Sequence, residues 1–199
     1  ALDTPFHVAV DVGPHVGLWA EPLTIIFKQV ICFEPRAQNV ECLRKNLEGV
    51  NAEIYPFGLS DETARKSFFM PSDIHNSGAG SFGEFGERAA TASVAEVRTL
   101  DSFNIPEINF IKMDIQGWEI NALRGGAQTI RRTQPIILCE NHPERAELVQ
   151  ELITLGYEKI LHVVKEDIFV PVTRLSPQTR QSIIQYFNDR KAYFESLMI

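Results

Sequence analysis

Long apolar runs are absent from this sequence. No stretch approaches the roughly 18 consecutive apolar residues that a membrane-spanning helix requires, and the first residues lack the basic and then apolar pattern of a secretory signal. We therefore expect no membrane span and a cytoplasmic protein. The chain starts almost at once with a strand-like segment, which leaves open whether a further segment precedes residue 1.

Cysteine and basic residues are also scarce. The three cysteines, Cys32, Cys42 and Cys139, are odd in number and far apart, so they form neither a disulfide framework nor a metal-ligand cluster. The 19 Lys and Arg against 26 Asp and Glu give a net charge of −7. This balance argues against a broad nucleic-acid-binding face, although a local basic patch remains compatible with it.

What the sequence does contain is an alternation of strand-like and helix-like segments. Predicted strands cover residues 7–12, 30–33, 52–59, 65–70, 96–100, 109–115, 135–141, 157–164 and 167–172. Predicted helices cover residues 16–28, 37–50, 118–130, 143–156 and 176–197, and residues 60–94 are predicted to form a long loop that contains the strand 65–70. This order predicts one α/β domain over residues 1–199, with a doubly wound sheet that ends in an antiparallel pair. Ligands of such sheets bind beyond the carboxyl ends of the strands.

The first strand is followed by a glycine-containing turn, DVGPHVG at residues 11–17. Gly13 and Gly17 permit positive φ and a close approach of a ligand to the backbone. The turn lacks the third glycine of a dinucleotide fingerprint, and Pro14 removes one amide donor, so a pyrophosphate is harder to hold here. Glu34 ends the next strand, where an acidic side chain can accept the ribose hydroxyls of NAD or of S-adenosylmethionine. The alternative is a tight turn and a solvated glutamate without a ligand.

Several further motifs, in a fixed order, resemble the FkbM family of S-adenosylmethionine-dependent methyltransferases. They are VDVGPHVG (10–17), FEP (33–35), FGLSDETA (57–64), NSGAGSF (76–82), VRTLDSF (97–103), IKMDIQGWEINALRGG (111–126) and IILCEN (136–141). Two positions depart from the family pattern: Gln116 replaces the usual acid, and Pro14-His15 stands where Ala-Asn is commoner. The first departure puts a catalytic carboxylate at residue 116 in doubt.

The resemblance implies a Rossmann-like class I methyltransferase with a seven-stranded mixed sheet whose last strand is antiparallel. It also implies S-adenosylmethionine as the cofactor, S-adenosylhomocysteine as the product, and adenine near Leu59 and Ser60. The cofactor-binding residues predicted from the turn and from the resemblance are Asp11, Gly13, His15, Gly17, Glu34, Pro35, Leu59, Ser60 and Asp114. Family members typically methylate a hydroxyl, often on a sugar or a small natural product.

Two residues are candidates for the catalytic chemistry. Asp114 ends the strand beside the point where the strand order reverses, and we expect it to position the acceptor or the cofactor, or to take a proton; a helix cap is its structural alternative. His142 follows the neighbouring strand and is the other candidate base, since an imidazole titrates near neutrality. Asp114, Glu140 and His142 are oxygen and nitrogen donors of the kind that bind metals, but no regular ligand spacing supports a metal site, and we expect none.

Three functions remain open at this point. The leading hypothesis is an O-methyltransferase that acts on a small-molecule or glycan hydroxyl. A nicotinamide-dependent oxidoreductase is less favoured because the third glycine is missing. A non-catalytic Rossmann-like binding module is the third. The sequence leaves the acceptor and the oligomeric state open.

Overall fold

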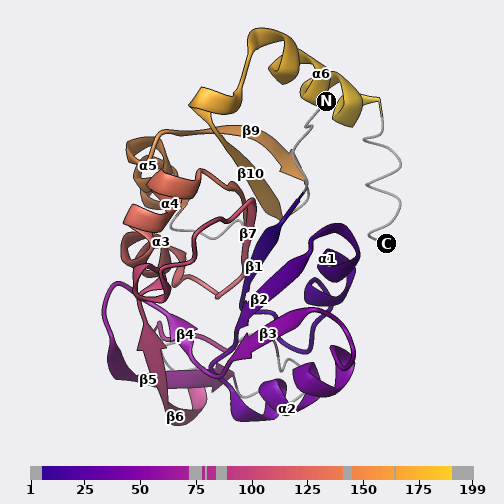
Figure 1. The fold of residues 1–199 in the computed structure, drawn as a ribbon. Coiled ribbons are helices and arrows are strands. Elements are labelled where there is room, and N and C mark those ends of the chain that lie inside the picture. The colour runs from indigo at the N-terminus through magenta and orange to yellow at the C-terminus, as the bar shows by residue number, and fades with distance from the viewer. Residues whose placement is uncertain are drawn as a thin grey trace.

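The computed structural model describes residues 6–71, 78, 80–83, 89–140, 145–163 and 165–189. A seven-stranded sheet forms its centre, with strand order β3-β2-β1-β7-β8-β10-β9 (Figure 1). The parallel strands are β1 (Val8–Val12), β2 (Gln29–Phe33), β3 (Ala52–Tyr55), β7 (Phe110–Met113) and β8 (Ile136–Glu140). The later β10 (Glu166–Pro171) runs antiparallel to β8 and to the edge strand β9 (Tyr157–Val163). The predicted mixed sheet with an antiparallel last strand is therefore confirmed.

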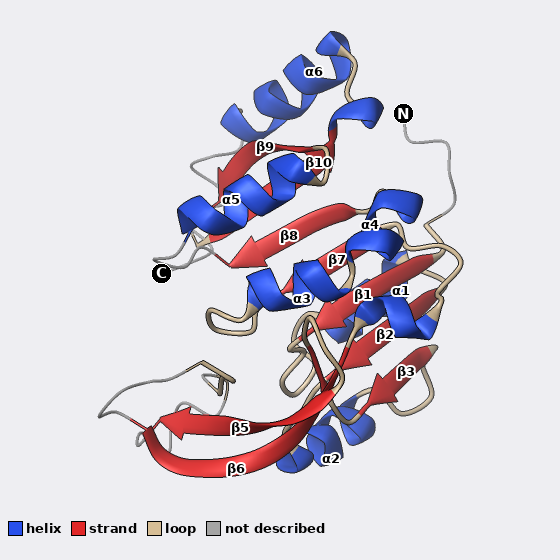
Figure 2. Cartoon of the chain, turned by 90° about the vertical axis from the view of Figure 1, so that its left-hand side faces the viewer, coloured by secondary structure: helices blue, strands red, loops and turns tan. Residues whose placement is uncertain are grey.

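Helices cover both faces of this sheet, as Figure 2 shows. One face carries α1 (Ala20–Ile26) and α2 (Ala37–Asn46), and the other carries α3 (Glu119–Gly125), α4 (Ala127–Thr133) and α5 (Arg145–Thr154). Side chains of a strand alternate between the faces, so Ala9 packs in the core with α1 and α2, whereas Val10 packs in the larger core with α3 and α5. Both faces of β1 are thus buried, as its apolar sequence predicts.

A second sheet of three strands, with order β4-β6-β5, lies beside the carboxyl ends of the main strands (Figure 2). It consists of β4 (Gly58–Leu59), β5 (Ala64–Pro71) and β6 (Ala89–Arg98). The prediction of one strand over residues 52–59 was wrong, because β3 and β4 belong to different sheets. Pro56 lies between them, and its missing amide and fixed φ interrupt the ladder. The predicted strands 65–70 and 96–100 correspond to β5 and β6, which pair antiparallel, but β6 begins at Ala89, inside the predicted loop.

Several predicted helices are shorter or divided, and the helix expected over 37–50 ends at Asn46. The expected helix 118–130 is two helices that meet at Gly126, where a Cβ would lie 3.0 Å from Leu100 of the 3-10 turn Leu100–Phe103. The expected helix 16–28 starts only at Ala20, since the glycine turn occupies its first residues. Towards the other end of the chain, Ser176 caps α6 (Pro177–Asn188) by accepting the Thr179 amide at 3.0 Å.

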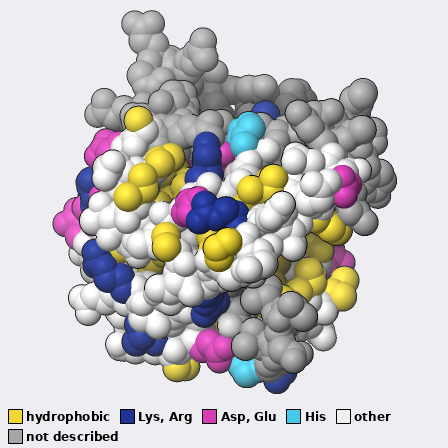
Figure 3. Space-filling model, turned by 90° about the horizontal axis from the view of Figure 1, so that it is seen from above, with side chains coloured by type: hydrophobic (Ala, Val, Ile, Leu, Met, Phe, Trp, Pro, Cys, Tyr) yellow, Lys and Arg dark blue, Asp and Glu magenta, His cyan; other side chains and the backbone are white. Residues whose placement is uncertain are grey.

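A view of the molecule from above shows acidic, basic and apolar side chains interspersed on its described surface (Figure 3). Within the described ranges, none of the helices combines the length and the apolar character needed to cross a bilayer.

Candidate functional site

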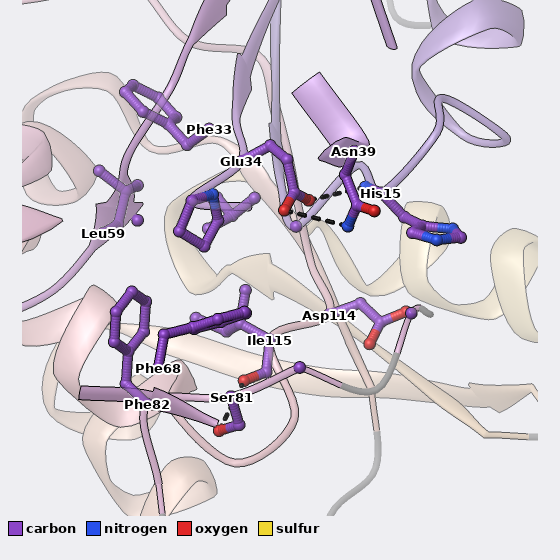
Figure 4. Close-up of a pocket in the computed structure, with 16 residues that line it drawn as sticks. His15, Phe33, Glu34, Asn39, Leu59, Phe68, Ser81, Phe82, Asp114 and Ile115 are labelled. Atoms are coloured by element: carbon purple, nitrogen blue, oxygen red, sulfur yellow. Dashed lines mark hydrogen bonds between the residues drawn. The ribbon is translucent and has the colours of Figure 1, made fainter. Parts of the chain in front are cut away.

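A pocket lies at the carboxyl ends of β1, β2 and β7, where the strand order reverses between β1 and β7 (Figure 4). It encloses about 490 Å³, part of which is open to solvent. Its walls come from the turns after β1 and β2, from β4, from β5 with residues 78 and 80–82, and from the end of β7. The lining residues are Val12, Gly13, His15, Phe33, Glu34, Pro35, Asn39, Gly58, Leu59, Phe68, Gly78, Gly80, Ser81, Phe82, Asp114 and Ile115.

The turn after β1 is held against the neighbouring strand ends. Gly13 has φ 79° and donates its amide to the Phe33 carbonyl at 3.0 Å. A Cβ on Gly13 would lie 2.2 Å from the Asp114 carbonyl oxygen, so this position accepts only glycine without a backbone shift. His15 adopts a left-handed φ of 54°, and the Gly17 amide closes the turn onto the Pro14 carbonyl at 2.8 Å. The turn therefore places its backbone directly at the pocket.

Glu34, at the end of β2, presents a buried carboxylate on the pocket wall. It accepts the His15 amide at 3.1 Å and the Asn39 side-chain amide at 3.2 Å (Figure 4). It also accepts the Arg36 amide at 3.0 Å. Burial raises the pKa of Glu34 to about 7, although the bonds from Arg36, Asn39 and His15 lower it. Since a carboxylate offers about four acceptor positions, Glu34 retains capacity for a further donor.

Asp114, just beyond β7, contributes a second carboxylate to the same pocket. Lys112 lies below it on β7, almost completely buried, with its Nζ 3.2 Å from Asp114 Oδ2. The Gln116 side-chain amide donates to Asp114 Oδ1 at 2.8 Å. Burial opposes ionisation of Asp114, but Lys112 and the hydrogen bonds outweigh it and lower its pKa below the ordinary value.

The apolar wall of the pocket depends on two glycines. The rings of Phe68 and Phe82 pack with their centroids 5.0 Å apart. A Cβ on Gly80 would lie 2.4 Å from the Phe68 ring, and one on Gly58 would lie 2.5 Å from the Phe82 ring. Glycine at both positions therefore lets these aromatic rings pack directly against the backbone of the pocket.

Most of the predicted cofactor-binding residues lie on this pocket: Gly13, His15, Glu34, Pro35, Leu59 and Asp114. The other three lie beside it. Asp11 is fully buried, and neither of its carboxylate oxygens has a hydrogen-bond partner among the described residues. Gly17 packs towards Leu43 of α2, and buried Ser60 accepts the Trp118 indole N–H at 3.3 Å. His142 is outside the described residues.

The sequence interpretation had assigned no role to several residues of the site. Asn39, in the first turn of α2, orients Glu34, and the only signal for it was its position shortly after the FEP motif. Phe68 comes from the strand that was predicted but not connected with the pocket. Glu140 accepts the Gln116 amide at 2.6 Å, which brings the ends of β7 and β8 together.

Comparison with known proteins identifies the domain. The model of the methyltransferase FkbM domain matches residues 11–186, which include the glycine turn, Glu34 and Asp114. The chain belongs to the FkbM methyltransferase family. The resemblance seen in the sequence motifs is thereby confirmed.

Solved structures of this class share the fold. The FkbM methyltransferase of Methylobacillus flagellatus KT superimposes with a TM-score of 0.61 at 19% identity, over 83% of this chain and 44% of that chain. Precorrin 8W decarboxylase of Methanobacterium thermoautotrophicum superimposes with a TM-score of 0.51 at 15% identity, over 84% of this chain and 82% of that chain. The chain thus has the class I methyltransferase architecture.

The matched relatives are longer than the aligned region. An alignment with Protein Ves of Cronobacter sakazakii (strain ATCC BAA-894) is 32% identical over 100 positions and covers 44% of this chain and 54% of that protein. The FkbM domain described here therefore spans about half the length of the first relatives that it matches.

Proposed function

We propose that this FkbM domain transfers the methyl group of S-adenosylmethionine to a hydroxyl of a sugar or small natural product. The observation that carries the proposal is the buried Glu34 carboxylate, which lies on the pocket wall opposite the Asp114 carboxylate (Figure 4). A carboxylate in this position suits a ribose hydroxyl. S-adenosylmethionine supplies an electrophilic methyl group, and the remaining tasks belong to residues of the chain.

The residues present fit this cofactor. Glu34 has capacity for a hydroxyl donor, and Leu59 with Phe82 offers apolar surface for a base. Gly13 and His15 bring the turn backbone to the pocket, and Pro35 lines it beside Glu34. Asp114 would attract the positively charged end of the cofactor or bind the acceptor hydroxyl. In this proposal Asp11, Gly17 and Ser60 support the pocket from beneath.

The chain's contribution to methyl transfer would be binding, alignment and removal of a proton. Holding the acceptor oxygen in line with the methyl group supplies a large part of the rate. A positioned base adds typically about 10²–10⁴-fold. Asp114 is our first candidate base because it lines the pocket, and His142, just after β8, is the second.

Glutamate 34 provides the test of cofactor binding. The change Glu34→Gln removes the carboxylate that we assign to the ribose, and we expect at least about a tenfold loss in affinity for S-adenosylmethionine, since hydrogen bonds to charged groups contribute about 1.5–3 kcal/mol. Isothermal titration calorimetry at pH 8 measures the change, with a melting curve to verify folding. The exposed Glu41→Gln on α2 is the matched control. Unchanged affinity in folded Glu34→Gln would remove Glu34 from the binding site.

Two further measurements separate the alternatives. NAD, titrated into the wild-type protein under the same conditions, should show no binding; binding of NAD in place of S-adenosylmethionine would support the oxidoreductase. Transfer of a tritiated methyl group to pooled monosaccharides, glycosides and hydroxylated metabolites tests the acceptor class. A protein that binds the cofactor but labels none of these pools would support a non-catalytic module or another acceptor class.

A further inference from the structure

Two carboxyl groups meet at the ends of adjacent parallel strands. The register of β7 and β8 pairs Met113 with Cys139, so the next residues, Asp114 and Glu140, come side by side. The Gln116 side-chain nitrogen lies between them, 2.8 Å from Asp114 Oδ1 and 2.6 Å from Glu140 Oε2. One amide group therefore donates to both carboxyls and holds them at the pocket edge.

The turn that carries Gln116 is itself fixed in an uncommon conformation. Gln116 has a left-handed φ of 54°, and Gly117 follows with φ 91°. The Gln116 carbonyl accepts the Ser81 hydroxyl at 2.9 Å, which ties the turn to the segment lining the pocket. Glutamine departs from the acid typical of the family at this position, and an ionised acid here could not donate to either neighbour. In this chain the amide therefore bridges two carboxyls.

The surroundings give the two carboxyls different ionisation. The Lys112 ammonium contacts Asp114, and the pKa of Asp114 is lowered despite its burial. The pKa of Glu140 is raised to about 7, mainly by burial. The negative charges of the adjacent Asp114 and of Glu166 and Glu119 raise it further. Among the described residues, Asp11 and His15 also interact electrostatically with Asp114, and Glu34 lines the same pocket. At neutral pH the favoured state of the pair is thus an ionised Asp114 beside a Glu140 that readily takes up a proton.

On the basis of the proposed function, we propose that Asp114 and Glu140, bridged by Gln116, act as one carboxyl pair that receives the proton of the methyl acceptor. The acceptor oxygen forms its bond to the methyl carbon while the carbon–sulfur bond breaks and leaves its electron pair on sulfur. The hydroxyl proton passes to Asp114, which lines the pocket, and is shared with Glu140 until solvent removes it. Asp114 is the catalytic residue of this pair, and Glu140 and Gln116 are positioning residues.

The pair solves a difficulty that Asp114 alone would have. A carboxylate whose pKa is lowered by an ammonium group is a weak base, because it holds a transferred proton poorly. A neighbouring carboxyl that titrates near neutrality gives the proton a more stable destination. The two groups then take up one proton together, with a macroscopic pKa that belongs to the pair.

Nuclear magnetic resonance of the side-chain carboxyls tests the pair without an acceptor. Protein labelled with ¹³C at Asp and Glu carboxyls, with S-adenosylhomocysteine added, is titrated from pH 5 to pH 9. We expect the Asp114 and Glu140 signals to move together near neutral pH. In Asp114→Asn, the Glu140 step should fall to lower pH, because the neighbouring negative charge is gone. In Gln116→Met, it should rise, because both carboxylates lose a donor. Neither shift is expected from the exposed control Glu41→Gln.

A Glu140 signal that titrates alone below pH 5.5, or that is unaffected by Asp114→Asn, would overturn the proposal.

A kinetic measurement adds a second criterion. With the pooled hydroxyl compounds and tritiated cofactor, we expect Glu140→Gln to lower the transfer rate at least about tenfold and to shift the acid limb of its pH profile, while cofactor affinity stays within about twofold. A wild-type rate and profile in Glu140→Gln would refute the role. If the wild-type protein does not bind S-adenosylmethionine, the proposed function is refuted instead. The resonance spectra then still show whether Asp114 and Glu140 titrate as a pair.

Discussion

At the scale of single residues, Gly13 shows most directly how packing limits the sequence. Its φ of 79° favours glycine, and a Cβ would also meet the Asp114 carbonyl at 2.2 Å. Gly49 has a similar φ of 82°, but no atom lies within 4 Å of its Cβ position. Substitutions at the two glycines therefore separate the free-energy cost of a left-handed backbone from the cost of a steric clash.

We expect Gly49→Ala to lower the free energy of unfolding by about 1–2 kcal/mol, the ordinary cost of a left-handed alanine. Gly13→Ala should cost clearly more, since the turn or the end of β7 must also move, and it should weaken S-adenosylmethionine binding. Urea denaturation and calorimetry of both variants measure these changes. Equal losses of stability in the two variants would show that the backbone near Asp114 moves away from the new Cβ at no cost in free energy.

The same scale shows what could be predicted of the site. Glu34 and Asp114 were predicted because each ends a buried strand, and the structure places both on the pocket. Asn39 received no role, and Glu140 was considered only as a metal donor, because their importance comes from hydrogen bonds to Glu34 and Gln116 that depend on side-chain directions. The amino-acid pattern predicts where strands end, but it does not predict which side chains form hydrogen bonds across a turn.

At the scale of elements, the cap of α6 offers a local test. The Ser176 hydroxyl accepts the Thr179 amide at 3.0 Å, which satisfies one of the free amides of the first helical turn. Ser176→Ala should destabilise the helix by about 1 kcal/mol, and faster amide hydrogen exchange across residues 177–188 measures it. Ser182→Ala, exposed in the same helix, is the control and should leave exchange unchanged or slower, since alanine favours helix. Identical exchange in both variants would contradict the cap.

Elements were predictable where one signal dominated. Short apolar runs such as that of β2 gave strands within a residue or two of their bounds. The break between β3 and β4 was missed because the apolar pattern continues across Pro56, although the chain passes from one sheet to another. The division between α3 and α4 was missed because it arises from a tertiary contact, the close approach of Leu100 to Gly126.

At the scale of the whole molecule, alternation of strands and helices was sufficient for the doubly wound class and for the end of the sheet that binds ligands. The three-stranded second sheet was not predicted as a separate sheet, although strands 65–70 and 96–100 were predicted, because β4 was merged with β3 and much of β6 lies in the segment predicted to be a loop. That sheet supplies Gly58, Leu59 and Phe68 to the pocket. Three of the sixteen residues that line the pocket thus come from a sheet that the alternation pattern does not describe.

The carboxyls gathered at this end of the sheet give the molecule a predicted pH dependence. Burial raises the pKa of Asp11 to about 6, and burial also raises those of Glu34 and Glu140 to about 7. Groups whose pKa is raised on folding stabilise the fold fully below their ordinary values, and that contribution is lost as the pH rises through the folded values. We expect these groups to make the ligand-free protein less stable as the pH increases from about 4.5 to 7.5. His15, whose pKa is lowered by burial, acts in the opposite direction.

A positively charged ligand should reverse part of this loss. S-adenosylmethionine carries a sulfonium charge that S-adenosylhomocysteine lacks, and each carboxyl that ionises near the pocket attracts it. The affinity ratio of the two ligands should therefore increase from pH 5.5 to pH 8, by about tenfold if one added charge interacts with roughly 1.4 kcal/mol in a partly buried site. Calorimetric titration of both ligands at the two pH values measures the ratio. Asp11→Asn, which removes a carboxyl beneath the turn, should reduce the increase, and exposed Glu41→Gln should preserve it. A ratio that is the same at both pH values would mean that the carboxyls of this pocket do not face the sulfonium.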